Sequence, residues 1–193
     1  MIRQPAKALE AADVSRLIEH VQQTRYPARN CVIVLLSFKA GLRACEIAGL
    51  RWQMVLTSNG KLGASVHVSR HIAKQGRARC IPMHPELTAA LATLHAETGR
   101  PREGPVICSE RRRHMTARSV VNWFRATYAR IGLDGCSSHS GRRTFITRSA
   151  RMLAKTGGSL RDIQELAGHQ ALTTTERYIA GDRDAQRKLV ALV

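Results

Sequence analysis

Arginine and histidine residues recur along the chain at helical spacings that could gather them around one phosphate group. Arg43 stands at an expected helix start just after Gly41, and Glu46 lies one turn later on the same face. His139 and Arg142 are three positions apart, so an imidazole and a guanidinium could converge on one ligand. The guanidinium is a planar fork that matches phosphate oxygens. Both segments therefore suggest chemistry on a phosphate.

A lysine, a second histidine and a tyrosine could supply proton transfer and a nucleophile. Lys74 lies in a predicted hairpin turn, His169 follows an expected helix end, and Tyr178 lies nine residues beyond His169. A phenol has a pKa of about 10, so a tyrosine at neutral pH needs a base or a positive field before it attacks. Taken singly, Lys74 could be a solvated turn residue, His139 a hydrogen-bonded core histidine and Tyr178 a core tyrosine. Only their combination points to chemistry.

The order of the motifs is more specific than any one of them. The chain carries G-L-R-x-x-E-I-x-x-L, a hairpin lysine, H-x-x-R-x-T-F, A-G-H and T-T-x-x-Y, in that order, at residues 41–50, 74, 139–145, 167–169 and 174–178. This combination resembles the catalytic domain of tyrosine recombinases, the phage integrase family. The resemblance extends from about Ala8 to Tyr178 and covers almost the whole chain.

The resemblance implies that Tyr178 attacks a DNA phosphodiester, forms a 3′-phosphotyrosyl link and releases a 5′-hydroxyl. Arg43 and Arg142 are then expected to hold the non-bridging oxygens of the scissile phosphate, and His169 to donate a further hydrogen bond to it. Negative charge gathers on the equatorial oxygens of the pentacovalent transition state. Fixed cationic donors stabilise that charge more than they stabilise the ground state.

The same resemblance assigns Lys74 as the general acid that protonates the departing 5′-oxygen. A 5′-alkoxide is a poor leaving group, and such proton transfer contributes roughly 10²–10⁴-fold. His139 is expected to assist proton transfer at the tyrosine, and Glu46 to support the arginines without taking part in the chemistry. No metal and no cofactor are expected, because cationic side chains stabilise the phosphate. The covalent link conserves the bond energy, so rejoining needs no ATP.

The charge of the chain points to a polyanionic partner. Lys and Arg total 31 against 14 acidic residues, which gives a formal net charge of +17 and a pI of about 11.1. The sequence holds 25 Arg and only 6 Lys. Double-stranded DNA is the expected partner. Contacts with its backbone are expected from the basic run Arg111, Arg112 and Arg113, and Arg143 is expected to point away from its neighbour Arg142 as a DNA-backbone or structural contact.

Composition also excludes several classes of protein. No apolar run approaches the roughly 18 residues that span a bilayer, and residues 1–10 contain no apolar signal segment. The five cysteines form no C-x-x-C pair and are expected to be free, mostly buried thiols in a reducing compartment. The sequence therefore predicts a cytoplasmic protein without membrane attachment.

A mostly helical domain must position the chemical groups. Apolar residues at i, i+3, i+4 and i+7 from Val14 to Val21 predict an amphipathic helix from about Ala11. Ser159-x-x-Asp162 and Thr173-x-x-Glu176 have the form of capping boxes. The other helices are expected over about 28–40, 43–50, 117–131, 139–152, 160–168 and 174–179, from Pro85, and in a tail from Asp184.

One small sheet is expected among these helices. Alternation and β-branched residues predict a hairpin of residues 64–71 and 77–83, and residues 105–108 could add a short strand. The predicted fold is therefore mostly α with a small β-hairpin or three-stranded sheet (α+β), the tyrosine recombinase catalytic-domain fold.

Two rival chemistries find less support. His67-x-x-x-His71 and Cys80-x-x-x-His84 place four possible zinc ligands on the hairpin. Structural zinc sites, however, usually have closer cysteine spacing. A Ser-His-Asp hydrolase would be expected to show a G-x-S-x-G motif, and the sequence has none.

The resemblance also frames the domain organisation and the assembly. We expect residues 1–193 to form a single catalytic domain without the N-terminal core-binding domain that most family members carry, either as a naturally short recombinase or as a truncated integrase. The apolar tail, residues 189–193, is expected to dock on a neighbouring subunit. The resulting assembly would be a homo-tetramer on two DNA duplexes.

The function expected from the sequence is site-specific DNA recombination for the integration, excision or inversion of a DNA element. Two alternatives stay open. The chain could be a catalytically silent DNA-binding regulator or integrase remnant, although all six expected catalytic side chains are present. It could also relax supercoils as a monomer, in the manner of a type IB topoisomerase, although the apolar tail favours a tetramer.

Overall fold

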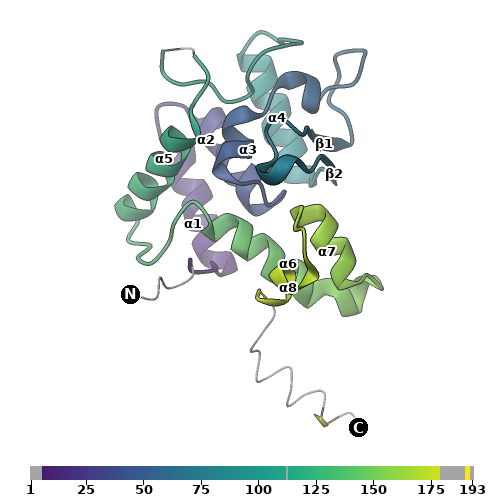
Figure 1. The fold of residues 1–193 in the computed structure, drawn as a ribbon. Coiled ribbons are helices and arrows are strands. Elements are labelled where there is room, and N and C mark those ends of the chain that lie inside the picture. The colour runs from purple at the N-terminus through teal and green to yellow at the C-terminus, as the bar shows by residue number, and fades with distance from the viewer. Residues whose placement is uncertain (1–5, 112, 179–189, 192–193) are drawn as a thin grey trace.

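The computed structural model describes residues 6–111, 113–178 and 190–191, and Figure 1 shows that most of them are helical. The helices before the sheet are α1 (Ala11–Gln22), α2 (Pro27–Phe38), α3 (Ala44–Gly49) and the 3₁₀ turn Trp52–Met54. The sheet pairs β1 (Ser65–Val68) with β2 (Arg79–Pro82) and is followed by α4 (Pro85–Glu97) and α5 (Ala117–Arg130). The C-terminal helices are α6 (Ser140–Thr156), α7 (Leu160–Ala167) and α8 (Leu172–Glu176).

The main hydrophobic core lies among α1–α5 and the hairpin. The predicted stripe on α1 is confirmed, because Val14, Leu17 and Val21 are all buried there. Helix α2 is apolar on nearly all sides and passes through the centre of this core, so it is buried along most of its length. The end of α2 therefore gives a fixed support for the loop and for α3 that follow it.

A second, much smaller core lies among α6–α8. Its buried members are Ile146, Ile163 and Ala167, with Tyr178 partly buried against them. In Figure 1 these three helices form a layer below the main body, and α7 lies beside β2. Helix α6 packs closely on α2 through Gly141, where an added Cβ would collide with Ser37. The molecule thus places two packed layers face to face.

The predicted hairpin is confirmed, but its strands are shorter than expected. β1 and β2 are antiparallel, with Val66 opposite Ile81, and residues 69–78 connect them. The connection leaves the ladder because Ala73 is buried and Ile72 packs against the main core, close to Gly49. The sheet of the described chain has two strands, since residues 105–108 contribute only isolated bridges.

Helix starts follow one of the two predicted capping boxes. At the start of α7, the backbone N–H and the hydroxyl of Ser159 both donate to the Asp162 carboxylate. The other prediction is wrong, because α8 begins at Leu172 after Ala171 and Thr173 lies inside it. Helix α6 also continues beyond the expected residue 152, because no glycine or proline lies between residue 152 and Gly157. The predicted tail helix lies largely outside the described residues.

All five cysteines are free, but they are less buried than expected: Cys80 is exposed, and Cys31, Cys45, Cys108 and Cys136 are half-buried. In the described part of the chain, no helix combines the length and the apolar character needed to cross a membrane.

Candidate active site

Arg43 and Glu46 are brought together by the first turn of α3. The chain turns at Gly41, whose φ of +62° is a left-handed conformation that costs glycine little. The Arg43 backbone N–H donates to Glu46 Oε2 at 2.9 Å, and Arg43 Nη1 donates to Glu46 Oε1 at 3.1 Å. The Glu46 side chain is fully buried, whereas the Arg43 side chain keeps 13% of its exposure. Part of the Arg43 guanidinium therefore remains open to a ligand.

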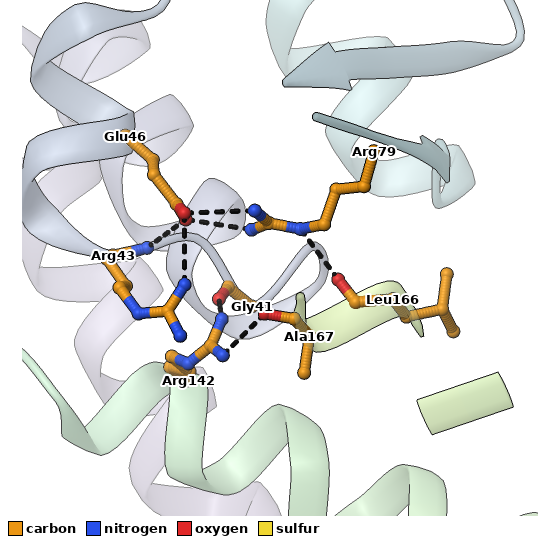
Figure 2. Close-up of polar contacts among 7 residues, drawn as sticks. All are labelled: Gly41, Arg43, Glu46, Arg79, Arg142, Leu166 and Ala167. Carbon is orange, nitrogen blue, oxygen red and sulfur yellow. Dashed lines mark hydrogen bonds and ion pairs between the residues drawn. The ribbon is translucent and has the colours of Figure 1, made fainter. Parts of the chain in front are cut away.

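A second arginine, Arg79 of β2, contacts the same carboxylate. Its Nη1 and Nη2 donate to the two oxygens of Glu46 at 2.9 and 2.8 Å, and its Nε donates to the Leu166 carbonyl at 2.9 Å (Figure 2). Burial alone would raise the pKa of Glu46. The hydrogen bonds and positive charges of Arg79 and Arg43 outweigh burial and hold this pKa below its ordinary value. Glu46 is therefore an ionised, buried anchor for two guanidiniums.

Arg142 joins the two layers of the molecule at the same place. It is buried in the first turn of α6, where Nη1 donates to the Gly41 carbonyl and Nη2 to the Ala167 carbonyl, both at 2.6 Å. Burial, with the positive charges of Arg43 and Arg79, lowers the pKa of Arg142 to about 10, so it stays protonated at neutral pH. In Figure 2 the guanidiniums of Arg43 and Arg142 lie next to each other. We call Arg43, Arg79 and Arg142 the guanidinium cluster.

His169 lies beside the guanidinium cluster as a neutral imidazole. Burial and the positive charges of Arg142, Arg43 and Arg79 lower its pKa to about 4. Its Nδ1 is 2.9 Å from the Thr175 hydroxyl of α8. A neutral imidazole that accepts this hydroxyl proton at Nδ1 carries its own proton at Nε2. His169 can therefore donate a hydrogen bond to an anion without carrying a charge.

Tyr178 follows α8 in a turn and stacks on this imidazole. The two ring centroids are 5.6 Å apart with an angle of 19° between the planes. The Tyr178 ring also packs on the small core of α6–α8 and is half-buried. The guanidinium carbon of Arg143 lies 5.6 Å from the ring centroid, which is a contact within the protein, one of the two kinds expected for this residue. A cation therefore lies over the aromatic ring of the expected nucleophile.

Lys74 and His139 lie on opposite layers of the molecule and share one electrostatic environment. Lys74 begins a 3₁₀ turn (Lys74–Gly76) within the β1–β2 connection and is exposed, and His139 is the residue before α6. Partial burial and the positive charges of Lys74, Arg142 and Arg43 lower the pKa of His139. A neutral imidazole at this position can accept a proton.

Together these groups make a site that can hold a phosphate and move protons around it. Arg43, Arg142 and His169 supply donors, Tyr178 supplies a hydroxyl, and His139 and Lys74 supply groups that transfer protons. They come from the starts of α3 and α6, the β1–β2 connection, the loop after α7 and the turn after α8. Among the described residues, no group of three or more His, Cys, Asp or Glu is placed to hold a metal ion.

Arg111 and Arg113, the described members of the basic run, lie away from this site. Arg29, in the first turn of α2, donates to the Cys108 carbonyl close to that run, whereas the guanidinium cluster lies beyond the other end of α2. A helix of 12 residues is about 18 Å long. Arg111 and Arg113 are exposed, and Arg112 lies outside the described residues.

Arg79 and Thr175 belong to the site and were missed in the sequence. The sequence did contain a signal for Arg79. It lies two residues before the buried Ile81 on β2, so both side chains are on the same face of the strand, and a charge falls on the buried face. A charge there needs a buried partner of opposite sign. Thr175 had no such signal. Its hydroxyl meets His169 only because α7 and α8 pack together.

The buried neutral histidine predicts a pH-dependent stability. The pKa of His169 falls from 6.5 to about 4 on folding, so the unfolded chain binds more protons in this window and stability decreases as the pH is lowered. We expect this group to cost about 2 kcal/mol of unfolding free energy between pH 7 and pH 5. Urea unfolding at both pH values measures the loss, which should be smaller in His169→Asn. His67→Asn, at an exposed position, should keep the full loss, and an unchanged loss in His169→Asn would contradict the assignment.

Comparison with known protein families places the chain in a single group. The model of the family described as the phage integrase family matches residues 7–184. The tyrosine recombinase XerC of Xylella fastidiosa (strain 9a5c) is 27% identical over 178 residues, which are 92% of this chain and 57% of the relative. This chain therefore spans little more than half the length of that protein.

Solved structures share the fold. The Tn1549 transposon integrase in complex with transposon right end DNA has a TM-score of 0.76 and 19% sequence identity, and the match covers 100% of this chain and 67% of the integrase. The XerA recombinase has a TM-score of 0.75 and 23% identity, and the match covers 98% and 66% of the two chains. The predicted fold is confirmed by these similarities.

Proposed function

Because the chain belongs to the phage integrase family, we propose that it is the catalytic domain of a site-specific DNA recombinase. It cleaves and rejoins DNA strands through a 3′-phosphotyrosyl intermediate. The observation that carries this proposal is the convergence of Arg43, Arg142, His169 and Tyr178, which four different parts of the fold bring to one place. Gathering buried cations in this way costs free energy, and an anionic ligand offsets that cost.

In the proposed reaction, the oxygen of Tyr178 attacks the scissile phosphorus. The bond from phosphorus to the 5′-oxygen breaks as the new phosphotyrosyl bond forms. Arg43 and Arg142 hold the non-bridging oxygens, and His169 donates from Nε2. The side-by-side guanidiniums of Figure 2 and the neutral state of His169 support these roles. Their positive field also stabilises the phenolate that forms on Tyr178.

Two different groups transfer protons, one from Tyr178 and one to the departing 5′-oxygen. His139 assists removal of the tyrosine proton, which the depressed pKa of its imidazole makes possible at neutral pH. Lys74 gives a proton to the departing 5′-oxygen, for which its exposed place in the β1–β2 connection suits it. We propose no metal and no cofactor for this chemistry. Rejoining is the reverse of cleavage, with a 5′-hydroxyl attacking the phosphotyrosine.

Double-stranded DNA is the proposed partner, and the net charge of +17 supports it. The similar Tn1549 integrase was solved with transposon DNA. We assign contacts with the DNA backbone to Arg111, Arg112 and Arg113. Of these, Arg111 and Arg113 are described and lie near the end of α2 that is farther from the guanidinium cluster. The guanidinium of Arg143 lies over the Tyr178 ring. For this residue we therefore propose a contact with the DNA backbone next to the scissile phosphate.

We propose that four copies assemble on two duplexes, each through its apolar C-terminal segment. Val190 is 77% exposed, and most of the remaining segment lies outside the described residues. Sedimentation of the protein with its DNA site tests this assembly, since a complex with a single copy would contradict it.

The free cysteines support a reducing cytoplasmic location, and residues 1–193 would act there as one catalytic domain.

A nicked suicide substrate tests the proposed function. When the nick lies a few nucleotides to the 3′ side of the scissile phosphate, the short fragment with the new 5′-hydroxyl diffuses away after cleavage, and the enzyme remains attached to the DNA. We expect an SDS-resistant adduct of one chain per strand, measured by gel shift and mass spectrometry. Salt-sensitive binding without an adduct would favour the silent DNA-binding regulator. Plasmid relaxation without strand exchange would favour the topoisomerase-like activity.

A further inference from the structure

Arg79 is a buried arginine to which the proposed reaction gives no role. Its side chain is only 6% exposed, so it is poorly placed to bind DNA directly. All three of its hydrogen-bonding nitrogens are engaged, two with Glu46 and one with the Leu166 carbonyl. Through these contacts β2 is tied to α3 on one side and to the end of α7 on the other (Figure 2).

We propose that Arg79 is a positioning residue that leaves Arg43 free to bind the scissile phosphate and sets the position of His169. This inference rests on the proposed function and deepens it. Its basis is the sharing of one buried carboxylate between two guanidiniums, together with the pairing of the carbonyls at the end of α7.

The two arginines divide the Glu46 carboxylate unequally. Arg79 donates to both carboxylate oxygens, whereas the Arg43 side chain donates only through Nη1. Nη2 and Nε of Arg43 are therefore left for a phosphate. The carboxylate neutralises one of the three guanidiniums, so the guanidinium cluster, which includes Arg142, keeps a net positive charge. Without Arg79, a fully buried carboxylate would draw Arg43 into a two-point contact and cancel its charge.

Arg79 and Arg142 together hold the C-terminal end of α7. Leu166 and Ala167 are consecutive, and their carbonyls accept from Arg79 and Arg142 respectively. Gly168 follows with a φ of +63°, and its missing Cβ would lie 3.1 Å from Arg79 Cδ. Arg79 thus packs directly beneath the residue that precedes His169. Loss of Arg79 would leave the Leu166 carbonyl unpaired and the support beneath His169 empty.

Three variants measured on the nicked substrate test the assignment. Arg79→Met is expected to slow adduct formation at saturating DNA on the order of 10²-fold, because small displacements of a catalytic group are costly. Its affinity for uncleaved DNA should change by less than about threefold. Arg79→Lys keeps the charge but not the fork, so we expect partial recovery. Arg125→Met, at an exposed position on α5, removes one charge and should match the parent.

A pH profile separates positioning from a general loss of structure. The groups that face Glu46 are Arg43 on its own helix, Arg79 on β2 and Arg142 on α6. Without Arg79 the carboxylate loses its main stabilising partner, so its pKa rises and a new protonation should enter the cleavage profile below neutral pH. The double variant Arg79→Met with Glu46→Gln removes that titration. An Arg79→Met variant that is slow but has the parent's pH profile would overturn the proposal.

Binding of a simple anion distinguishes failure of this inference from failure of the proposed function. Titration with inorganic phosphate, followed by NMR of the arginine Nε–H groups, reports on the guanidinium cluster without any reaction. We expect about tenfold weaker binding in Arg79→Met and unchanged binding in Arg125→Met. If the parent forms no adduct but this difference holds, the recombinase function fails and Arg79 still positions an anion site. Unchanged phosphate binding in Arg79→Met would overturn the role of Arg79.

Discussion

Tyr178→Phe is expected to abolish the covalent protein–DNA adduct while leaving salt-sensitive DNA binding in place. The substitution removes one oxygen, and without that oxygen no phosphotyrosyl bond can form. The phenyl ring remains, so the stacking on His169 and the packing on the α6–α8 core are retained. Loss of the adduct would thus reflect lost chemistry rather than a lost fold. Adduct formation on the nicked substrate and DNA affinity by fluorescence anisotropy measure the two properties separately.

The chain itself supplies the controls for this experiment, because it has three tyrosines. Tyr26→Phe and Tyr128→Phe make the same chemical change outside the site, and Tyr128 is buried in the main core. Both variants should form the adduct at the parent's rate. An adduct that survives in Tyr178→Phe and disappears in one of the others would show that the nucleophile is misassigned.

Lys74→Met is expected to slow cleavage by about 10²–10⁴-fold, the usual contribution of a general acid. Lys74 is exposed, so its replacement should leave the fold and its stability unchanged. The proposed step moves a proton to the 5′-oxygen as its bond to phosphorus breaks. Single-turnover rates on the nicked substrate measure the defect, and Lys61→Met, at another exposed loop lysine, should show none.

A substrate with sulfur in place of the bridging 5′-oxygen tests the role itself. A thiol has a pKa of about 8.5, far below that of an alcohol, so a thiolate leaves without help from an acid. We therefore expect the sulfur substrate to restore Lys74→Met to within about tenfold of the parent. Equal defects on the oxygen and sulfur substrates would mean that Lys74 binds DNA and does not transfer a proton.

Local geometry made part of the site predictable from the sequence. The spacing of Arg43 and Glu46 predicts a contact within one turn, and the structure has it at 3.1 Å. The convergence of α3, α6 and α7 is a different matter. It depends on long-range packing, such as the contact of Gly141 with α2, and no periodicity carries that information. Only the resemblance to a family supplied it.

The parts of the fold that differ from prediction have tertiary causes. The strands were expected to run up to the Lys74 turn, but Ile72 and Ala73 pack toward the core and end the ladder at Val68. Alternation describes the two faces of a strand and does not report where the chain must fold back. The contact of Arg143 with Tyr178 joins the first turn of α6 to the turn after α8. The sequence does not predict this contact either, because the two residues are far apart along the chain.

Arg142 has two duties that one substitution cannot separate. The side chain that is proposed to bind the scissile phosphate also connects the α2–α3 loop to the end of α7, because it donates to the carbonyls of Gly41 and Ala167. A descendant of this protein that lost its activity would still be selected to keep Arg142 for folding. Lys74 is exposed and would be under no such selection. The presence of Arg142 in a diverged relative is therefore weak evidence that the relative is active, whereas the presence of Lys74 is strong evidence.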